Sequence, residues 1–144
     1  MKRPAPPALA LLGLAALPLL AQQPAAWVAP KEERQRANPV ANSDEVQKRG
    51  RMLYQRHCAM CHGDKGKGDG PAARLHAERS KRAPQDLTDA KVQAGMTDGE
   101  IFWKLGSGFK EDAQIIMPSF TEEIPKDEDR WKLVHYVRAL GAQK

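Results

Sequence analysis

The chain contains two cysteines, Cys58 and Cys61, and a histidine, His62, follows the second one directly. Two cysteines cannot build a disulfide-rich scaffold. A structural zinc site takes four ligands, and a sequence with two cysteines, four histidines and no second cysteine pair does not favour one. A thioredoxin-like redox disulfide belongs to a strand–helix context, whereas the residues before Cys58 favour a helix. The pattern favours chemistry that uses the two thiols and the imidazole together, with zinc and a redox disulfide as the alternatives.

The spacing Cys-x-x-Cys-His is typical of covalent attachment of a c-type haem. Two thiols three residues apart at the end of a helix can add to the two vinyl groups of a haem, and the histidine that follows then lies under the iron. We therefore predict thioether bonds at Cys58 and Cys61 and an iron bond from His62. A bound haem would also supply a core to a domain of about 100 residues, which is marginal without a cofactor.

The methionines are the candidates for a sulfur ligand on the opposite face of the haem. Met52 and Met60 belong to the attachment helix and motif, so they cannot easily reach that face. Met117 precedes Pro118, and a residue before proline is held in extended backbone, which suits a loop that crosses the far face. We predict Met117 as the sixth ligand. The alternatives are one further methionine and two histidines, Met96, His76 and His135.

Hydrophobic spacing predicts an all-α domain over residues 43–144. A first helix is expected after a cap at Ser43 or the residue before it, because apolar residues then recur every three or four positions. A middle helix is expected from about Thr97 to Gly106, and a last amphipathic helix is expected to end at Gly141. No alternating pattern is long enough to predict a β-strand.

The first 21 residues are typical of an export signal. Lys2 and Arg3 precede an apolar run over residues 8–21, which is shorter than the roughly 20 residues that span a bilayer. We predict a signal peptide over residues 1–21 and a mature protein in the periplasm or another exported location. An uncleaved anchor is the alternative, and only then do we expect membrane contact.

Residues 22–42 are rich in proline and alanine. Their prolines argue against a continuous helix, so we expect an extended lead-in to the domain. This lead-in is either a loose tether or a segment whose Trp27 and Val28 lie on the domain surface or contact a partner.

The charge of the chain is moderately basic. Lys and Arg total 23 and Asp and Glu total 18, which gives a formal net charge of +5. This excess is too small to predict nucleic-acid binding, and none is expected. Basic residues gather in the segment 74–82 and acidic residues in the segment 122–129. The asymmetry indicates either ordinary solvated faces or a basic surface at the haem edge that docks redox partner proteins. A monomer is the default expectation.

The motifs and their order resemble the small class I c-type cytochromes over about residues 38–141. The stretch Gly-Lys-Gly-Asp-Gly-Pro-Ala-Ala follows His62, Met117-Pro118 lies downstream, and a terminal helix carries Trp131 and Tyr136. The resemblance implies a cytochrome c fold, with about three to five helices wrapped around one covalently bound haem c. It also implies that Gly50 of the first helix packs against Tyr136 of the last.

The same resemblance implies three further roles around the haem. A backbone carbonyl is expected to accept the N–H of His62, with Pro71 as the candidate. Trp103 and Arg138 are either near the haem propionates or part of ordinary packing and surface charge.

The function implied is that of an electron carrier rather than an enzyme. Such a protein passes single electrons between redox partners by cycling its iron between Fe(III) and Fe(II). The alternative is a haem-bearing electron-transfer subunit, tethered to or stably bound in a respiratory complex or dehydrogenase. A second alternative, an open-site haem peroxidase or gas sensor, requires that Met117 does not bind the iron.

Overall fold

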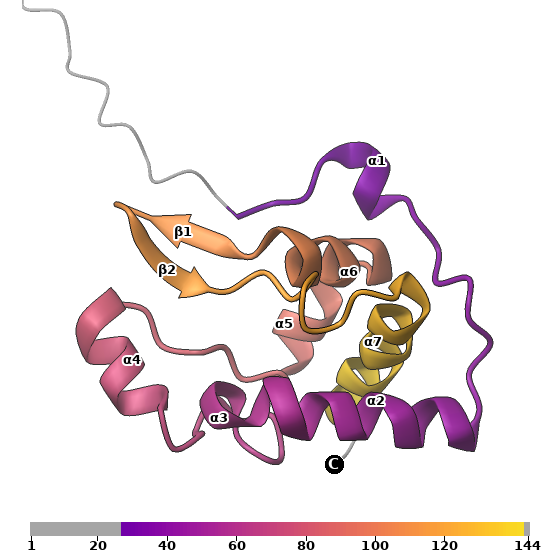
Figure 1. The fold of residues 1–144 in the computed structure, drawn as a ribbon, viewed down its shortest axis with the longest axis horizontal. Helices are drawn as coiled ribbons and strands as arrows, with labels where there is room; N and C mark the ends of the chain where they lie inside the picture. Colours follow the sequence, from indigo (N-terminus) through magenta and orange to yellow (C-terminus); the bar gives the residue numbers. More distant parts are fainter. Residues whose placement is uncertain (1–26, 143–144) are drawn as a thin grey trace, which may run out of the picture.

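The computed structural model describes residues 27–142. Within them the chain forms seven helices and one two-stranded hairpin (Figure 1). In chain order these are α1 (Lys31–Arg34), α2 (Asp44–His57), α3 (Ala59–His62), α4 (Ala73–Ser80), α5 (Ala90–Ala94), α6 (Asp98–Ser107), β1 (Phe109–Glu111), β2 (Gln114–Met117) and α7 (Asp127–Ala142). The predicted signal peptide, residues 1–21, lies outside the described residues. Between residues 27 and 142, no helix is both long enough and apolar enough to cross a membrane.

Side-chain caps begin two of the main helices, and the cap at Ser43 confirms the prediction. The Ser43 hydroxyl accepts a hydrogen bond from the N–H of Val46 at the start of α2, and the Thr97 hydroxyl accepts one from the N–H of Glu100 at the start of α6. Each cap satisfies one of the N–H groups that a helix start leaves without a partner. The helix α7 continues through Gly141, so the expected stop there is wrong. Gln93 packs against Gly141, where a side chain would collide with it.

The helices α2 and α7 cross closely, and this crossing is the centre of the fold. A Cβ added at Gly50 would lie 2.8 Å from the Cβ of Tyr136 and would also collide with the carbonyl of Lys132. The predicted contact between Gly50 and Tyr136 is therefore confirmed. The buried side of α7, which includes the fully buried Leu133 and Val134, faces the common core. The all-helical class is confirmed, and the short helices between α3 and α6 extend the expected set.

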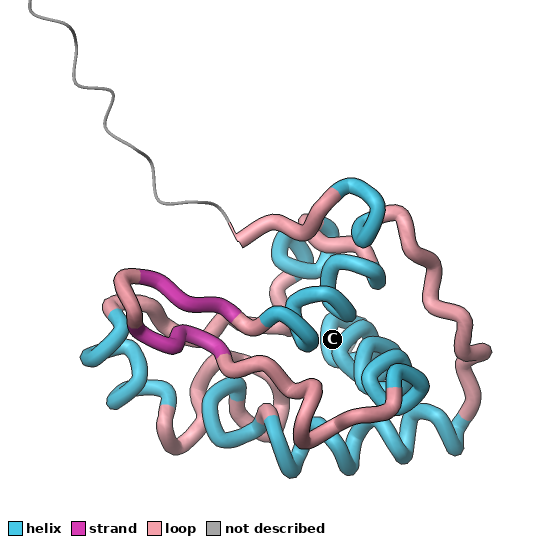
Figure 2. Tube along the Cα trace, turned by 45° about the horizontal axis from the view of Figure 1, so that its top comes forward, coloured by secondary structure: helices cyan, strands magenta, loops and turns pink. Residues whose placement is uncertain are grey.

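The hairpin β1–β2 was not expected from the sequence. Its strands have three and four residues, which is too short for an alternating pattern to be recognised. Both residues of its turn, Asp112 and Ala113, have positive φ angles of 47° and 64°. Such turns usually contain glycine, and the absence of that signal hid the hairpin. Figure 2 shows it at one end of the molecule, where β2 contacts α4.

The segment from residue 27 to residue 42 differs from the extended lead-in expected. It contains the one-turn helix α1, which packs on α6 (Figure 1). Ala29 is buried, with 2% of its surface exposed. Farther along, the Nδ2 group of Asn38 donates to the carbonyl of Trp131 on α7, at 3.0 Å. These contacts make the segment part of the domain surface rather than a loose tether.

The close crossing generates a prediction about Gly50. We expect Gly50→Leu to lower the free energy of unfolding by about 3 kcal/mol, because the added side chain has to push α7 away. Gly50→Ala should be destabilising in the same direction. The measurement is denaturant unfolding followed by circular dichroism.

Gly106 is the matched control, because it also lies inside a helix. A Cβ there would meet only the Cγ2 atom of Thr121, at 3.9 Å. Gly106→Ala should leave stability unchanged or slightly raised. Equal effects of alanine at the two positions would contradict the crossing.

A second prediction concerns the ion pair that joins the two crossing helices. The Nη2 atom of Arg49 lies 2.6 Å from Oδ2 of Asp129, and this hydrogen bond holds the pKa of Asp129 below its usual 3.8. The pair therefore stabilises the fold at neutral pH, and this contribution is lost as the pH falls below about 4. Because Arg49 is 44% exposed, we expect Asp129→Asn to cost only about 0.5–1 kcal/mol at pH 7.

The check is unfolding free energy measured from pH 7 down to pH 2 for wild type and Asp129→Asn. The difference in unfolding free energy between the two proteins should vanish toward pH 2. Glu78→Gln removes the more exposed pair Arg74–Glu78 and should show no such gap. A gap for Asp129→Asn that stays constant down to pH 2 would refute the linkage.

Candidate functional site

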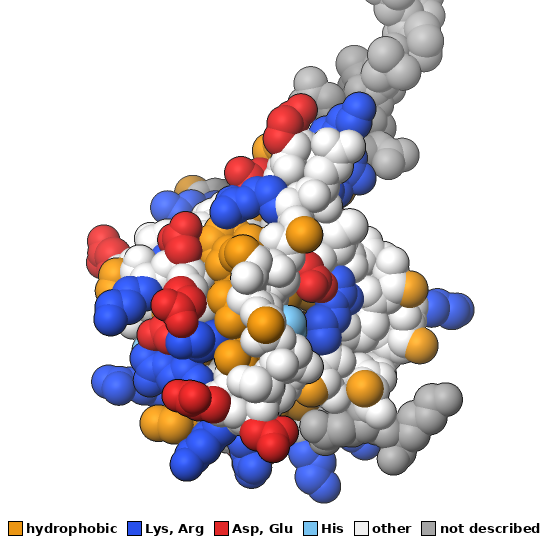
Figure 3. Space-filling view, turned by 90° about the vertical axis from the view of Figure 1, so that its right-hand side faces the viewer, with side chains coloured by type: hydrophobic (Ala, Val, Ile, Leu, Met, Phe, Trp, Pro, Cys, Tyr) orange, Lys and Arg blue, Asp and Glu red, His pale blue; other side chains and the backbone are white. Residues whose placement is uncertain are grey.

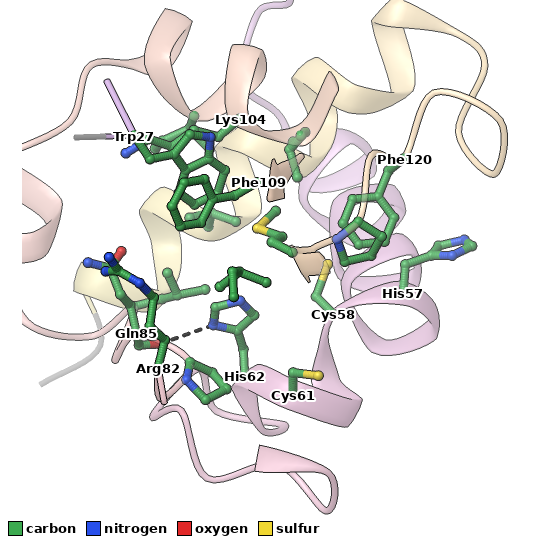
Figure 4. Close-up of a pocket in the computed structure, with 18 of the residues that line it drawn as sticks. Trp27, His57, Cys58, Cys61, His62, Arg82, Gln85, Lys104, Phe109 and Phe120 are labelled. Carbon is green, nitrogen blue, oxygen red and sulfur yellow. Dashed lines mark hydrogen bonds between the residues drawn. The ribbon is translucent and has the colours of Figure 1, made fainter. Parts of the chain in front are cut away.

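A cavity of about 700 Å³ opens between the α2–α3 corner, the loop before α5, the helix α6 and the hairpin. All four residues predicted as cofactor contacts, Cys58, Cys61, His62 and Met117, line it. Figure 4 shows Cys61 and His62 on one side and Trp27, Lys104 and Phe109 on the opposite side. The volume lies within the range of cofactor pockets, roughly 300–1,000 Å³. Segments far apart in the sequence thus meet around one space.

The attachment residues sit on a break between two helices. Helix α2 ends at His57, and the N–H groups of Cys61 and His62 both bond to the carbonyl of Cys58, at 3.1 and 2.9 Å. The turn directs both thiols and the imidazole to the cavity. Both thiols are free, and burial raises the pKa of the Cys58 thiol to about 12. Such a thiol is a poor source of thiolate, which disfavours thiol–disulfide exchange.

The imidazole of His62 is oriented by a backbone carbonyl. Its Nδ1 atom lies 3.0 Å from the carbonyl oxygen of Gln85. Because a carbonyl can only accept, Nδ1 carries the proton, and Nε2 keeps its lone pair free for a metal. Burial, the larger effect, lowers the pKa of His62, so the imidazole stays neutral at pH 7. The group therefore has the protonation state that an iron ligand needs.

The prediction that the carbonyl of Pro71 accepts the N–H of His62 is wrong. The loop after α3 folds back on the attachment turn, where Gly70 N–H bonds to the carbonyl of Cys61 and Ala72 N–H to that of Met60. Pro71 is thereby held, exposed, beside α3. The carbonyl that faces Nδ1 of His62 belongs instead to Gln85. Gln85 follows Pro84, in a loop that no pattern in the sequence connected to the site.

Met117 lies at the end of β2, where the hairpin holds it at the cavity. It pairs with Phe109 across the hairpin and is partly buried against the core. Gly108 precedes β1 with a φ angle of +60°, and a Cβ there would lie 2.8 Å from the Met117 carbonyl oxygen. A glycine is therefore required for the close approach that fixes this end of the hairpin.

The alternative ligands differ in their surroundings. Met96 and His76 line the cavity, but the Met96 sulfur already accepts a hydrogen bond from Nζ of Lys104, at 3.5 Å. His135 is not among the described residues that line the cavity, and its Nε2 atom lies 2.7 Å from the carbonyl oxygen of Val40.

For Trp103 and Arg138, the structure favours the packing alternative over a place near the haem propionates. Among the described residues, neither Trp103 nor Arg138 lines the cavity. Arg138 instead bonds to Asp98 and to the Met96 carbonyl, both at 2.6 Å. Its role is to join α7 to the start of α6, which is the packing role left open by the sequence.

The cavity wall contains functional residues that the sequence analysis did not single out for it. They are basic or aromatic side chains from five different segments, namely Trp27, Arg82, Lys104, Phe109 and Phe120. The two cations are each held by a carboxylate. Nη2 of Arg82 lies 2.6 Å from Glu111, and Nζ of Lys104 lies 3.0 Å from Glu100. Two of the five had a sequence signal: Arg82 ends the basic segment, and Trp27 was a candidate for contact with the domain surface or a partner.

The residues present fit a covalently attached haem. The donor set offers two thiols, a neutral imidazole and a thioether around one cavity with a largely apolar lining. The wall also contains a buried N–H, Nε1 of Trp27, that has no acceptor among the described residues. A haem would bring vinyl groups to the thiols, iron to the nitrogen and sulfur, and carboxylates to the polar side of the wall.

Comparison with known proteins gives the following matches. A family model described as Cytochrome c matches residues 47–141. A chain of the Kuenenia stuttgartiensis reducing HAO-like protein complex Kustc0457/Kustc0458 is similar, with a TM-score of 0.57 and 29% identity over 71% of this chain. This chain spans under half, 46%, of that one. A structure described as the KustC0563 c-type cytochrome gives a TM-score of 0.46 and 25% identity over 63% of this chain and 95% of its own. The curated proteins contain no match.

The size of the cavity generates a prediction for the chain without its cofactor. Without the cofactor, the largely apolar lining of this space would be exposed to water, and a domain of about 100 residues is marginal without a group that fills its core. We expect the full chain with Cys58→Ser and Cys61→Ser to be largely unfolded. Far-ultraviolet circular dichroism during heating is the measurement, with wild type as the control. A cooperative, native-like melt of the double variant would contradict it.

Proposed function

The chain belongs to the cytochrome c family, and from that premise we propose that it is an exported monohaem carrier that passes single electrons between redox proteins. Membership implies an electron-transfer protein with covalently bound haem c. The observation that carries the finer proposal is the meeting of Cys58, Cys61, His62 and Met117 around one cavity. Because the chain has only two cysteines, it can hold one haem through two thioether bonds.

We assign the holding residues as follows. Cys58 and Cys61 form the thioether bonds, His62 binds the iron through Nε2, and Met117 binds it from the hairpin. When bound, the haem supplies a one-electron Fe(III)/Fe(II) couple, and histidine–methionine ligation raises its potential. No residue of the site has to make or break a bond with a substrate, so we propose a carrier rather than an enzyme.

The other residues keep the site rigid and dry. The carbonyl of Gln85 fixes the ring plane of His62, and the fully buried Tyr54 donates its hydroxyl to the carbonyl of Gly63, at 2.8 Å, directly after the attachment turn. Buried apolar side chains such as Leu105 and Phe120 line the cavity. A site that keeps its ligands fixed and excludes water changes little when its charge changes, which favours fast electron transfer.

We place the partner surface at α4 and the residues that follow it. Arg74, Arg79, Lys81 and Arg82 are all exposed there, and Arg82 also lines the cavity. This positive group lies next to the hairpin at one end of the molecule. Arg74 and Arg82 pair with Glu78 and Glu111, and the two further cations, Arg79 and Lys81, leave the group net positive. On the face in Figure 3, Lys and Arg side chains are likewise interspersed with Asp and Glu. A net positive surface beside the cofactor steers acidic partners.

The alternative, a subunit stably bound in a larger redox complex, is favoured by one observation. The chain is similar over 71% of its length to part of a chain in the Kuenenia complex. However, the docking of α1 on α6 weakens the idea that the whole segment 22–42 acts as a spacer. Size-exclusion analysis of a periplasmic extract separates the two proposals, because a free carrier elutes at monomer size and a subunit elutes with its complex.

The ligand assignment predicts a specific optical change. The oxidised wild-type protein should show the weak near-infrared band of a methionine–Fe(III) bond, and Met117→Ala should lose it. The variant should also bind carbon monoxide rapidly in its reduced state, because its sixth position is open. The proteins are to be made in a host with haem-attachment machinery.

Met96→Ala is the matched control, because it removes a second methionine from the same cavity. It should retain the band. A wild-type protein with covalent haem but no band would overturn Met117 ligation and favour a ligand-binding or peroxidase function. Loss of the band in Met96→Ala alone would transfer the ligand role to Met96.

A further inference from the structure

The N-terminal segment before the family-matched residues is fitted closely to the domain. A Cβ added at Gly99 of α6 would lie 2.8 Å from the carbonyl oxygen of Arg36 and would collide with that of Glu33. The guanidinium of Arg36 lies over the ring of Phe102, 4.7 Å from its centroid. With Ala29 buried as well, the backbone of residues 29–36 rests in a fixed position on α6.

This docking places Trp27 at the cavity. Its indole stacks on Phe109, with ring centroids 5.1 Å apart and an angle of 16° between the planes. Nζ of Lys104 lies 4.9 Å from the centroid of its ring. Figure 4 shows Trp27, Phe109 and Lys104 together on the wall opposite His62 and Cys61. The indole is therefore clamped between a strand and a helix and lines the cavity.

The Nε1–H group of Trp27 is the unexplained feature of this wall. It is buried, and no acceptor lies within hydrogen-bond distance among the described residues. A buried N–H without a partner costs roughly 1–3 kcal/mol, so such groups are rare in folded proteins. The aromatic and cationic contacts of Trp27 do not use this group. An acceptor is therefore missing from the space that the indole lines.

We propose that Trp27 donates its indole N–H to a propionate carboxylate of the bound haem, so that the N-terminal segment completes the cofactor site. The proposal rests on the haem-carrier function above. Carboxylates are the strong acceptors that a haem brings to its polar edge, and a charged acceptor forms the stronger type of hydrogen bond. Lys104, whose Nζ lies 4.9 Å from the Trp27 ring centroid, lines the same cavity. Its charge is shared with Glu100, so the indole N–H remains the donor that carries the proposal.

The inference gives the N-terminal segment a function that the sequence alone left open. Trp27 lies 20 positions before residue 47, the first family-matched residue. In this position it acts on the cofactor as a positioning residue: it fixes one carboxylate and reduces the effect of that negative charge at the iron. Partner proteins and export are not involved in the argument, so its test needs only the purified holoprotein.

The experiment compares wild type with Trp27→Phe as holoproteins. Phenylalanine retains an aromatic ring for Phe109 and Lys104 and removes the N–H. We expect the propionate bending band in the resonance Raman spectrum to shift. We also expect the midpoint potential to fall, because a carboxylate without its donor stabilises Fe(III) more strongly. The near-infrared band should remain, which shows that the axial ligands are unchanged.

Trp103→Phe is the matched control, because it makes the same chemical change on α6 at a residue outside the cavity lining. This variant should leave the propionate bending band and the midpoint potential unchanged. An unchanged Raman band in Trp27→Phe would overturn the proposal while the carrier function stands, and it would indicate that water fills the site. Failure of the wild type to hold haem would overturn both.

Gly99→Val tests the same inference from the other end of the segment. Its side chain displaces α1 from α6 and so withdraws Trp27 without altering the indole. We expect the propionate band to shift as in Trp27→Phe. A wild-type spectrum from this variant, with intact thermal stability, would contradict the role given to the docked segment.

Discussion

The close crossing of α2 and α7 fixes the geometry on which the rest of the site depends. Gly50 brings the two helices together, and Tyr136 of α7 then lies beside Tyr54 of α2, with ring centroids 5.3 Å apart. The Tyr54 hydroxyl in turn bonds to the carbonyl of Gly63, one residue after the attachment motif. Burial, as the main cause, raises the pKa of Tyr54 strongly, so this hydroxyl remains a donor. The crossing therefore sets the position of the haem-binding turn, and Tyr54 of α2 and Val137 of α7 also line the cavity.

The cofactor site is assembled from pieces that have little structure of their own. Helix α3 has four residues, the hairpin strands have three and four, and the carbonyl that orients His62 comes from a loop. Loops of this kind carry function when a rigid frame positions them. Here the frame consists of α2, α6 and α7, which contribute most of the core. This division explains how the site can be precise without regular structure around the iron.

The sequence predicted the parts of the site that follow from local spacing. The Cys58–His62 motif and Met117 before Pro118 are short patterns with a physical reason for each residue, and all of them line the cavity. The contact of Gly50 with Tyr136 was implied by resemblance and was confirmed. The cap at Ser43 was predicted because capping is a local property.

What the sequence could not provide depends on contacts between distant segments. Gln85 offers only a backbone carbonyl, which no residue type reveals, so the prediction settled on Pro71. The hairpin has a two-residue turn without glycine, and its strands are too short for a pattern. Trp27 was expected in a lead-in, because its partners, Phe109 and Lys104, lie more than 70 residues away in the sequence.

The cavity wall runs from Trp27 to Val137, so nearly the whole described chain takes part in closing it. The attachment motif, in contrast, lies in the first half of the sequence. During synthesis from the N-terminus, the cysteines therefore emerge while α6, the hairpin and α7 have still to be made. In the finished fold Cys58 is buried, with 9% of its surface exposed. Because the chain without its cofactor is expected to be largely unfolded, this thiol stays accessible until the haem is attached. Maturation therefore has a required order: the haem is attached first, and the protein folds around it second.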